Sequence, residues 1–277
     1  YVDIRNNVFY NWSGEGCYGG ENQHVNIVNN FYKPGPATNS SGTSNRTRYR
    51  IAKIGVRTTS YCQDKDGSWN AWKPSLHKWG TFHIEGNKVD GNAEVTADNW
   101  TKGVYEQQDN NDKVDYLWTD DVKAAIKAAA PVLDANGVTT HAADGAYAQV
   151  LRYAGACNYR DAIDNLIVKD VQDGSASCSA ASNSAGLGYI NTPKDVLSAL
   201  PELNGNPYPG LKADTSIDTD GDGMPADFER EFGLNPDDAA DGNTRTLDPD
   251  MNYTNLEMYL HYLVRDIVNR QTEGGAR

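Results

Sequence analysis

The stretch Val2-Asp-Ile-Arg-Asn-Asn-Val-Phe-Tyr10 recurs, with changes, as Val25-Asn-Ile-Val-Asn-Asn-Phe-Tyr32 and as Phe82-His-Ile-Glu-Gly-Asn-Lys-Val89. In each copy apolar residues alternate with polar ones, an Asn follows, and a second apolar segment continues the chain. Alternation of this kind is typical of a β-strand that buries one face. The first two copies are 23 residues apart, a spacing that suits short parallel strands stacked with their Asn residues in line.

This repeat predicts a mainly β fold, a right-handed parallel β-helix. An antiparallel sandwich with Asn-containing hairpin turns is the alternative, and it is less favoured because the chain after each Asn pair continues as a strand. Alternation places one set of side chains inside the coil: Val2, Ile4, Val25, Ile27, Phe82 and Ile84. It places a second set outside: Asp3, Arg5, Asn26 and His83.

The pattern after Trp118 changes to one typical of helices. Helices are expected over 119–130, which ends before Pro131, over 142–154 and over 161–171. These segments lack a core of large apolar residues, so we expect them to wrap around the coils. The predicted domains are therefore the terminal coils over 1–118, with a long loop over 33–78, a helical and loop wrap over 119–205, and a small calcium-loop module over 206–277.

The long loop over 33–78 carries aromatic and cationic side chains together. Its aromatic residues include Tyr49, Tyr61, Trp69, Trp72 and Trp79, and its cations include Arg46, Arg48, Arg50, Lys53 and Arg57. Long loops on a rigid scaffold often carry binding sites. Flat rings stack on sugar faces and guanidinium groups pair with carboxylates, so the composition favours an anionic sugar chain. A loop that merely packs on the coils is the competing interpretation.

The segment Asp218-Thr-Asp-Gly-Asp-Gly-Met-Pro-Ala-Asp-Phe-Glu229 has the spacing of a calcium-binding loop. The predicted ligands of Ca²⁺ are the carboxylates of Asp218, Asp220, Asp222 and Glu229, together with the carbonyl of Met224. Asp248, Asp250 and Asn252 begin a second loop of this type, but Tyr253 replaces the glycine and Tyr259 replaces the glutamate. A second ion is therefore left open.

Composition excludes several classes of protein. The chain has 277 residues, 38 of them acidic and 25 basic, which gives a net charge of −13 and argues against nucleic acid as a partner. It contains no apolar run long enough for a transmembrane helix. The four cysteines do not have the spacing of metal ligands. They either form two disulfides, Cys17–Cys62 and Cys157–Cys178, or remain four unpaired thiols, and the sequence leaves both alternatives open. The calcium loop fits a secreted, cell-surface or periplasmic location.

Several segments together resemble the C-terminal part of bacterial pectate lyases of polysaccharide lyase family 1. The segments are 1–12, 18–21, 25–38 and 160–171. The tail over 218–260 looks like a thrombospondin type 3 or EF-hand-like calcium-binding appendage. The resemblance implies a right-handed parallel β-helix that cleaves polygalacturonate by β-elimination. In that family calcium bridges the substrate carboxylate and an arginine removes the C5 proton.

The chain departs from that family where catalysis is expected. The family's Arg-x-Pro-Arg type motif precedes the strand that matches 1–10, and this sequence contains no such motif. We therefore assign no catalytic residue, expect the catalytic arginines upstream of Tyr1, and expect an N-terminal fragment of the same protein as a partner. The remaining candidates for substrate binding are Arg5, Tyr18, Glu21 and Arg50.

The leading functional hypothesis is the C-terminal part of a secreted pectate lyase that acts on polygalacturonate with calcium. A non-catalytic, calcium-dependent polysaccharide-binding module is the first alternative, since it needs no catalytic base. A hydrolase of the polygalacturonase type ranks below both, because the chain lacks the acidic and Gly-His-Gly clusters that such enzymes carry.

Overall fold

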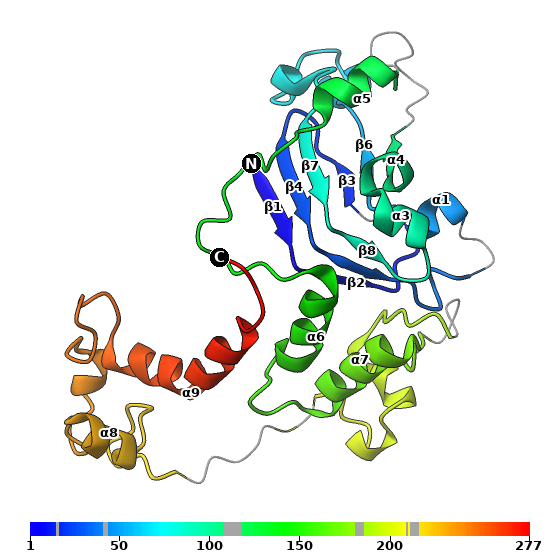
Figure 1. Ribbon diagram of the computed structural model, residues 1–277. Coiled ribbons are helices and arrows are strands. Elements are labelled where there is room, and N and C mark those ends of the chain that lie inside the picture. Colours follow the sequence, from blue (N-terminus) through cyan, green and yellow to red (C-terminus); the bar gives the residue numbers. More distant parts are fainter. Residues whose placement is uncertain (15–16, 41–43, 108–117, 181–185, 209, 211–215) are drawn as a thin grey trace. The chain divides into compact units, whose positions relative to one another are not determined.

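A computed structural model of the chain describes residues 1–14, 17–40, 44–107, 118–180, 186–208, 210 and 216–277 (Figure 1). The chain forms two compact units. Unit 1 comprises 1–155, 162–209 and 274–277, and unit 2 comprises 156–161 and 210–273. The repeat and the predicted helical wrap, apart from residues 156–161, fall in unit 1, and the predicted calcium loop falls in unit 2.

The described residues of unit 1 form three parallel sheets of three strands each. The first is β1 (Val2–Arg5), β4 (His24–Val28) and β7 (Thr81–Glu85), the second is β2 (Val8–Tyr10), β5 (Phe31–Lys33) and β8 (Lys88–Val89), and the third is β3 (Cys17–Gly19), β6 (Ala52–Ile54) and β9 (Val104–Glu106). In the first sheet Ile4 pairs with Ile27, which pairs with Ile84. The parallel pairing of the three copies of the repeat is thus confirmed, and the antiparallel sandwich is wrong.

The predicted fold class, a mainly β chain built as a right-handed parallel β-helix, was wrong. The described strands are two to five residues long, the sheets are separate and short with no closed or solenoid sheet among them, and more residues lie in helices than in strands. The physical reason is that the repeat has only three copies, so the two sheets built from it stop at three strands. The remainder of unit 1 satisfies its backbone in helices and turns instead.

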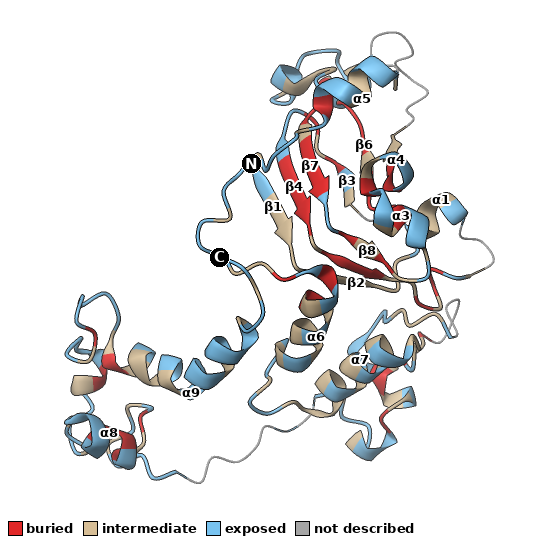
Figure 2. Ribbon diagram, in the orientation of Figure 1, coloured by how far each residue is buried: buried red, intermediate tan, exposed pale blue. Residues whose placement is uncertain are grey.

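The apolar core of unit 1 lies on the inward faces of the strands. Its buried members are Val25, Ile27, Tyr32, Ile51, Ala52, Ile54, Phe82, Ile84, Val89, Val95, Val104 and Ile126. Figure 2 shows β4 and β7 largely buried, whereas β1 at the sheet edge is more accessible. Alternation therefore assigned the core-facing residues of the central strands correctly.

The outward face of the first sheet is covered, although the alternation predicts solvent there. Asn26 is 0% exposed and His83 is 6% exposed. Helix α5 (Asp120–Ile126) ends before the predicted Ala130 because the amide of Ala128 donates to the Phe82 carbonyl at 2.8 Å. The chain beyond it then covers Asn26, whose side-chain oxygen accepts from Val132 N at 2.8 Å.

Unit 1 contains further helices, of which those over 93–97, 99–103 and 143–153 pack against the strands. These further helices are α1 (Asn45–Arg48), α2 (Thr59–Cys62), α3 (Ala93–Ala97), α4 (Asn99–Gly103), α6 (Ala143–Tyr153) and α7 (Ala162–Asp173), with 3₁₀ turns at η1 (Lys73–Ser75), η2 (Pro193–Ser198) and η3 (Pro201–Leu203). The helices predicted over 142–154 and 161–171 correspond to α6 and α7. No disulfide joins the cysteines of the described chain.

In its described part, unit 2 consists of loops and two helices, α8 (Ala226–Phe232) and α9 (Asn255–Gln271), with a 3₁₀ turn at η4 (Asp241–Asn243). Helix α9 begins with a capping box, in which the Thr254 side chain accepts from Glu257 N at 3.2 Å and the Glu257 carboxylate accepts from Thr254 N at 2.7 Å. Aromatic rings of the two helices pack together: Phe228, Phe232, Tyr259 and Tyr262. Among all described helices, none has the length and apolar character that a bilayer crossing requires.

Candidate functional site

The predicted calcium loop folds around the side chain of Asp218. Its two carboxylate oxygens accept from Gly221 N at 2.7 Å and from Gly223 N at 3.0 Å. Both glycines have positive φ, 81° and 98°, a conformation that other residues adopt only with strain. Short acidic side chains that accept from backbone amides a few residues onward are a strong turn signal, so the local sequence dictates this tight loop.

The loop brings acidic groups from three segments together. Oxygens of Asp218, Asp220 and Asp222 form one group, and oxygens of Asp222, Glu229 and Asp241 form a second, with the atoms of each group within 4.8 Å of one another. Asp222 belongs to both groups. Gly242 permits the approach, because a Cβ atom there would lie 2.4 Å from Asp222 Oδ2. We call these five residues the carboxylate cluster.

Several oxygens of the carboxylate cluster are buried and accept no hydrogen bond from any described residue. They are Oδ2 of Asp220, Oδ2 of Asp222, both side-chain oxygens of Glu229, and Oδ1 of Asp241. Glu229 itself is 0% exposed. Burial of a carboxylate without a partner is costly, and neighbouring negative charges add repulsion.

The same arrangement changes the pKa values of two groups. Burial, followed by repulsion from Asp220 and the other acids, raises the pKa of Glu229 to about 7. Burial likewise raises the pKa of Asp222. Clustered oxygens that lack protein donors are the ligand set that a hard divalent cation prefers, so the residues fit calcium.

The structure brings together the four carboxylates that the sequence predicted as ligands and adds Asp241. Asp241 lies outside the twelve-residue frame, and only the downstream run Asp241-Gly-Asn243 signalled it. The Met224 side chain is fully buried and its amide donates to Asp222 Oδ1 at 2.8 Å. A role for the Met224 carbonyl as a ligand stays a prediction.

The second acidic loop is held by its own hydrogen bonds. Asp248 Oδ2 accepts from Asn252 N at 2.7 Å and from Tyr253 N at 2.9 Å, and Oδ1 accepts from Asp250 N at 3.1 Å. Donation by these backbone amides, Tyr253 foremost, lowers the pKa of Asp248. Within the described residues this loop does not join a group of three acidic ligands.

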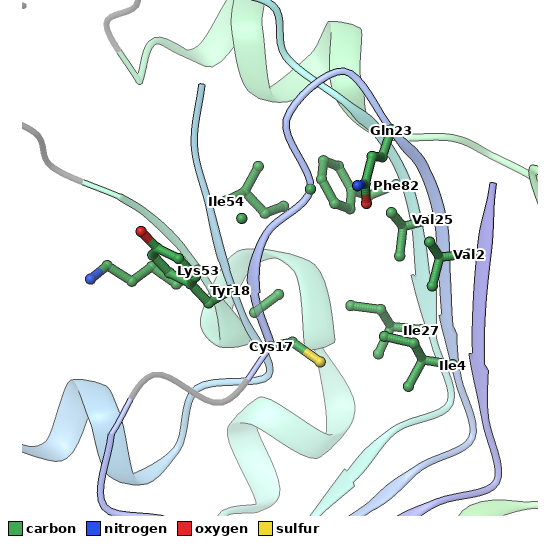
Figure 3. A pocket seen from close by; sticks show the side chains of 13 residues that line it. Val2, Ile4, Cys17, Tyr18, Gln23, Val25, Ile27, Lys53, Ile54 and Phe82 are labelled. Atoms are coloured by element: carbon green, nitrogen blue, oxygen red, sulfur yellow. The ribbon is translucent and has the colours of Figure 1, made fainter. Parts of the chain in front are cut away.

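A second candidate site lies on the third sheet, β3–β6–β9. Tyr18 pairs in register with Lys53, and Lys53 pairs with Tyr105, so the three side chains share one face. Lys53 Nζ lies 5.6 Å from the centre of the Tyr18 ring. Figure 3 shows Tyr18 and Lys53 directed away from the apolar side chains that line the inner pocket. We call Tyr18, Lys53 and Tyr105 the outer row.

Polar and cationic side chains flank the outer row. The Arg46 guanidinium lies 4.5 Å from the Tyr105 ring centre and pairs with Glu106 at 2.7 Å. Gln107 Nε2 donates to the Tyr18 hydroxyl at 2.9 Å. Cations stacked on aromatic rings beside hydrogen-bonding groups can bind an anionic sugar, through the ring faces and through the charge.

Of the four predicted substrate-binding residues, Tyr18 lies in the outer row and is 54% exposed. Glu21 lies in the turn after β3, is 8% exposed and pairs with Arg57 at 3.6 Å. Arg50 is 7% exposed and donates to the Gly14 carbonyl at 3.1 Å.

Arg5 lies on a different sheet from Tyr18. Its Nε pairs with Asp3 at 3.1 Å and its Nη1 donates to Thr140 Oγ1 at 2.9 Å.

Tyr105 was missed by sequence reasoning because β9 does not repeat the Asn-containing pattern. The short alternation Val104-Tyr-Glu106 was the only signal.

Comparison with known proteins adds an independent finding. No family model matches the chain. The chain is 28% identical over 270 residues to a probable pectate lyase C of Aspergillus flavus, 28% identical over 270 residues to one of Aspergillus oryzae, and 25% identical over 267 residues to one of Aspergillus terreus. These similarities support a relationship with pectate lyases.

Each alignment covers 95% of this chain and 48% of the relative, so the chain spans about half the length of the curated relatives it matches. The relatives are fungal, and the bacterial affinity and the thrombospondin type 3 resemblance of the tail stay predictions. The expected N-terminal partner fragment also stays a prediction.

Proposed function

We propose that the chain is part of a secreted pectate lyase that cleaves polygalacturonate by calcium-assisted β-elimination. The observation that carries this proposal is the similarity to fungal probable pectate lyases C along 95% of the chain. Cell-surface and periplasmic locations fit the same argument, because the calcium loop suits the higher calcium concentration outside the cytosol.

The outer row supports a role in substrate binding. Tyr18 offers an exposed ring, and Lys53 places a cation beside it. An acidic polysaccharide presents both a flat sugar face and a carboxylate, so this combination suits it. In this proposal Tyr18 and Lys53 contact the substrate. Glu21 and Arg50, both buried, position the surrounding turns, and Arg5 holds the segment that contains Thr140.

The carboxylate cluster supports a structural calcium site in unit 2. We assign Asp218, Asp220, Asp222, Asp241 and Glu229 as its carboxylate ligands, with the carbonyl of Met224 as a further one. The buried oxygens that accept no protein hydrogen bond are the reason for this assignment. Calcium bound there stabilises unit 2 and carries no step of the lyase reaction.

The test is to incubate the natural protein that carries this chain with polygalacturonate and calcium, and to follow both reducing ends and the ultraviolet absorbance of unsaturated uronides. We expect the two signals to rise together. Reducing ends without absorbance would show a hydrolase. Binding without either product would show a polysaccharide-binding module.

A pair of variants tests the outer row in the same assay. Tyr18→Ala removes the exposed ring, and we expect it to weaken binding of polygalacturonate by about tenfold. Tyr159→Ala is the matched control, because Tyr159 is similarly exposed, at 49%, and lies outside the outer row. Equal binding by the two variants would remove Tyr18 from the substrate site.

A further inference from the structure

The loop over 57–76 exposes three aromatic side chains that the outer row does not include. Tyr61 is 48% exposed, Trp69 is 43% exposed and Trp72 is 50% exposed. Single exposed aromatics are common on proteins, but a group on one short loop is typical of a recognition site. We call this segment the aromatic loop.

Hydrogen bonds hold the aromatic loop in a defined conformation. Asn70 N donates to the Cys62 carbonyl at 3.0 Å, and Asn70 Nδ2 donates to the Tyr61 carbonyl at 2.9 Å. Trp72 N donates to Asn70 Oδ1 at 2.9 Å, and Gln63 forms an antiparallel bridge with Trp69. The rings are therefore presented by a built frame, so a ligand would not have to order them on binding.

Each part of this surface pairs a ring with a cation. The Arg57 guanidinium lies 4.0 Å from the Tyr61 ring centre and 4.9 Å from that of Trp72. Lys73 Nζ lies 5.0 Å from the Trp69 ring centre. The loop thus repeats the same unit, an aromatic face with a positive charge beside it.

The local charge differs in sign from that of the whole chain. Residues 57–76 carry three basic side chains (Arg57, Lys65 and Lys73) against two acidic ones (Asp64 and Asp66), which gives +1, whereas the chain carries −13. Glu21 pairs with Arg57 at 3.6 Å and fixes this guanidinium in place. A positive patch on an acidic protein favours an anionic ligand.

We propose that the aromatic loop is a second binding site for an acidic oligosaccharide, in which sugar faces stack on Trp69 and Trp72 while carboxylates meet Lys73 and Arg57. A ligand that repeats a ring and a carboxylate matches a surface that repeats a ring and a cation. This inference rests on the proposed function for the identity of the sugar. A second contact on the same polymer raises its apparent affinity without changing the outer row.

The experiment measures binding of the full chain to polygalacturonate oligomers by titration calorimetry, with calcium present throughout. Fully methyl-esterified oligomers keep the sugar face and lose the charge, and polyglutamate keeps the charge and lacks the sugar. We expect polygalacturonate to bind more tightly than either probe, because the site uses ring and charge together.

Two variants locate the binding. Trp69→Ala and Lys73→Gln should each weaken polygalacturonate binding by about tenfold. Lys65→Gln is the matched control, because it removes the same charge from an exposed position on the same loop, and it should bind like the unmodified chain. Thermal unfolding of every variant should match that of the unmodified chain, since both targeted side chains lie at the surface.

The outcomes separate this inference from the proposed function. If the unmodified chain binds polygalacturonate and both Trp69→Ala and Lys73→Gln bind equally well, the second site is overturned and the proposed function stands. If Lys65→Gln weakens binding as much as Lys73→Gln, general charge explains the binding and the site is overturned. If the unmodified chain does not bind polygalacturonate, both proposals fail.

Discussion

The two units bury polar side chains in opposite ways. In unit 1, Asn30 Oδ1 accepts from Asn7 Nδ2 at 3.0 Å, and Asn87 Oδ1 accepts from Asn30 Nδ2 at 2.8 Å. Asn99 Oδ1 in turn accepts from Asn87 Nδ2 at 3.1 Å. In unit 2, the carboxylate cluster has five buried oxygens without any hydrogen bond from the described protein.

The difference follows from the chemistry of the two side chains. An amide both donates and accepts, so successive asparagines satisfy one another along the stacked strands. An ionised carboxylate only accepts, so a group of them needs donors or a cation from elsewhere. We therefore expect the asparagine ladder to stabilise unit 1 under all conditions, and the carboxylate cluster to stabilise unit 2 only when calcium is bound.

Removal of calcium should give the largest effect. A ligand at a thousandfold its Kd stabilises the state that binds it by about 4 kcal/mol, and this contribution disappears when a chelator is added. We expect unit 2 to unfold at lower temperature and to lose protection of its amides against hydrogen exchange. Differential scanning calorimetry and hydrogen exchange with and without chelator measure both changes.

Unit 1 is the internal control for that experiment. Its ladder amides, such as those of Asn30 and Asn87, should exchange at the same rate with and without chelator, because their acceptors are other asparagines. Equal loss of protection in both units would show that the two arrangements do not differ as proposed. Unchanged protection in unit 2 would remove the calcium assignment.

Substitution inside the ladder should give the next largest effect. Asn87→Ala removes the acceptor of Asn30 N at 2.9 Å and of Asn30 Nδ2 at 2.8 Å, and it removes the donor to the Ile27 carbonyl at 2.7 Å. Leaving these buried groups unpaired should cost about 3 kcal/mol in the free energy of unfolding. Denaturant unfolding of unit 1, followed by its own amides, measures this change.

Asn7→Ala is the matched variant for the ladder. Asn7 is exposed at the end of the ladder, and its side-chain amide donates to Asn30 Oδ1. Loss of this side chain should therefore lower the free energy of unfolding by only about 1 kcal/mol. An effect of Asn7→Ala as large as that of Asn87→Ala would contradict the view that burial makes the ladder important.

Neutralisation of one ligand should affect unit 2 in two opposite directions. Glu229→Gln removes a buried charge, so in chelator the variant should be more stable than the unmodified chain. It also removes a charged ligand, so calcium affinity should fall by about tenfold to a hundredfold. Calcium titration and thermal unfolding with and without chelator give the two values. Glu231→Gln, at an exposed position just beyond, is the control and should change neither.

The sequence predicts the parts of these sites whose spacing is local. Asn7, Asn30 and Asn87 stand at matching places in a visible repeat, and the acids from Asp218 to Glu229 stand in one loop. Asn99 joins the asparagine ladder from helix α4, and Asp241 joins the carboxylate cluster from the turn η4, so neither the repeat nor the twelve-residue loop includes them. A repeat likewise reports the register between strands but not whether the sheets join into a solenoid, which is why the parallel pairing was found and the fold class was not.

The roles of the arginines were less predictable still. Arg5 and Arg50 have the same chemistry as a substrate-binding arginine, yet their guanidinium groups meet Thr140 and the Gly14 carbonyl. Such partners are distant in sequence or belong to the backbone, and no spacing rule identifies them. Tyr18 was a candidate only through the resemblance, and the structure places it on strand β3 with 54% of its surface exposed.

The pH dependence of calcium binding should give the smallest effect and test the cause most directly. The pKa of Glu229 is raised from 4.5 to about 7 by burial and by its acidic neighbours. Without calcium, protonation of Glu229 in the folded state therefore stabilises unit 2. This stabilisation is fully present below pH 4.5 and is lost as pH rises through about 7.

Calcium competes with the same proton for Glu229. The affinity for calcium should therefore rise up to about pH 7 and then level off, and it should be about tenfold lower one pH unit below that point. Calcium titrations between about pH 5 and 8 measure this curve, and it should flatten in Glu229→Gln, which lacks the titrating carboxylate. An unchanged slope in that variant would show that the buried carboxylate of Glu229 is not the group that competes with calcium for the proton.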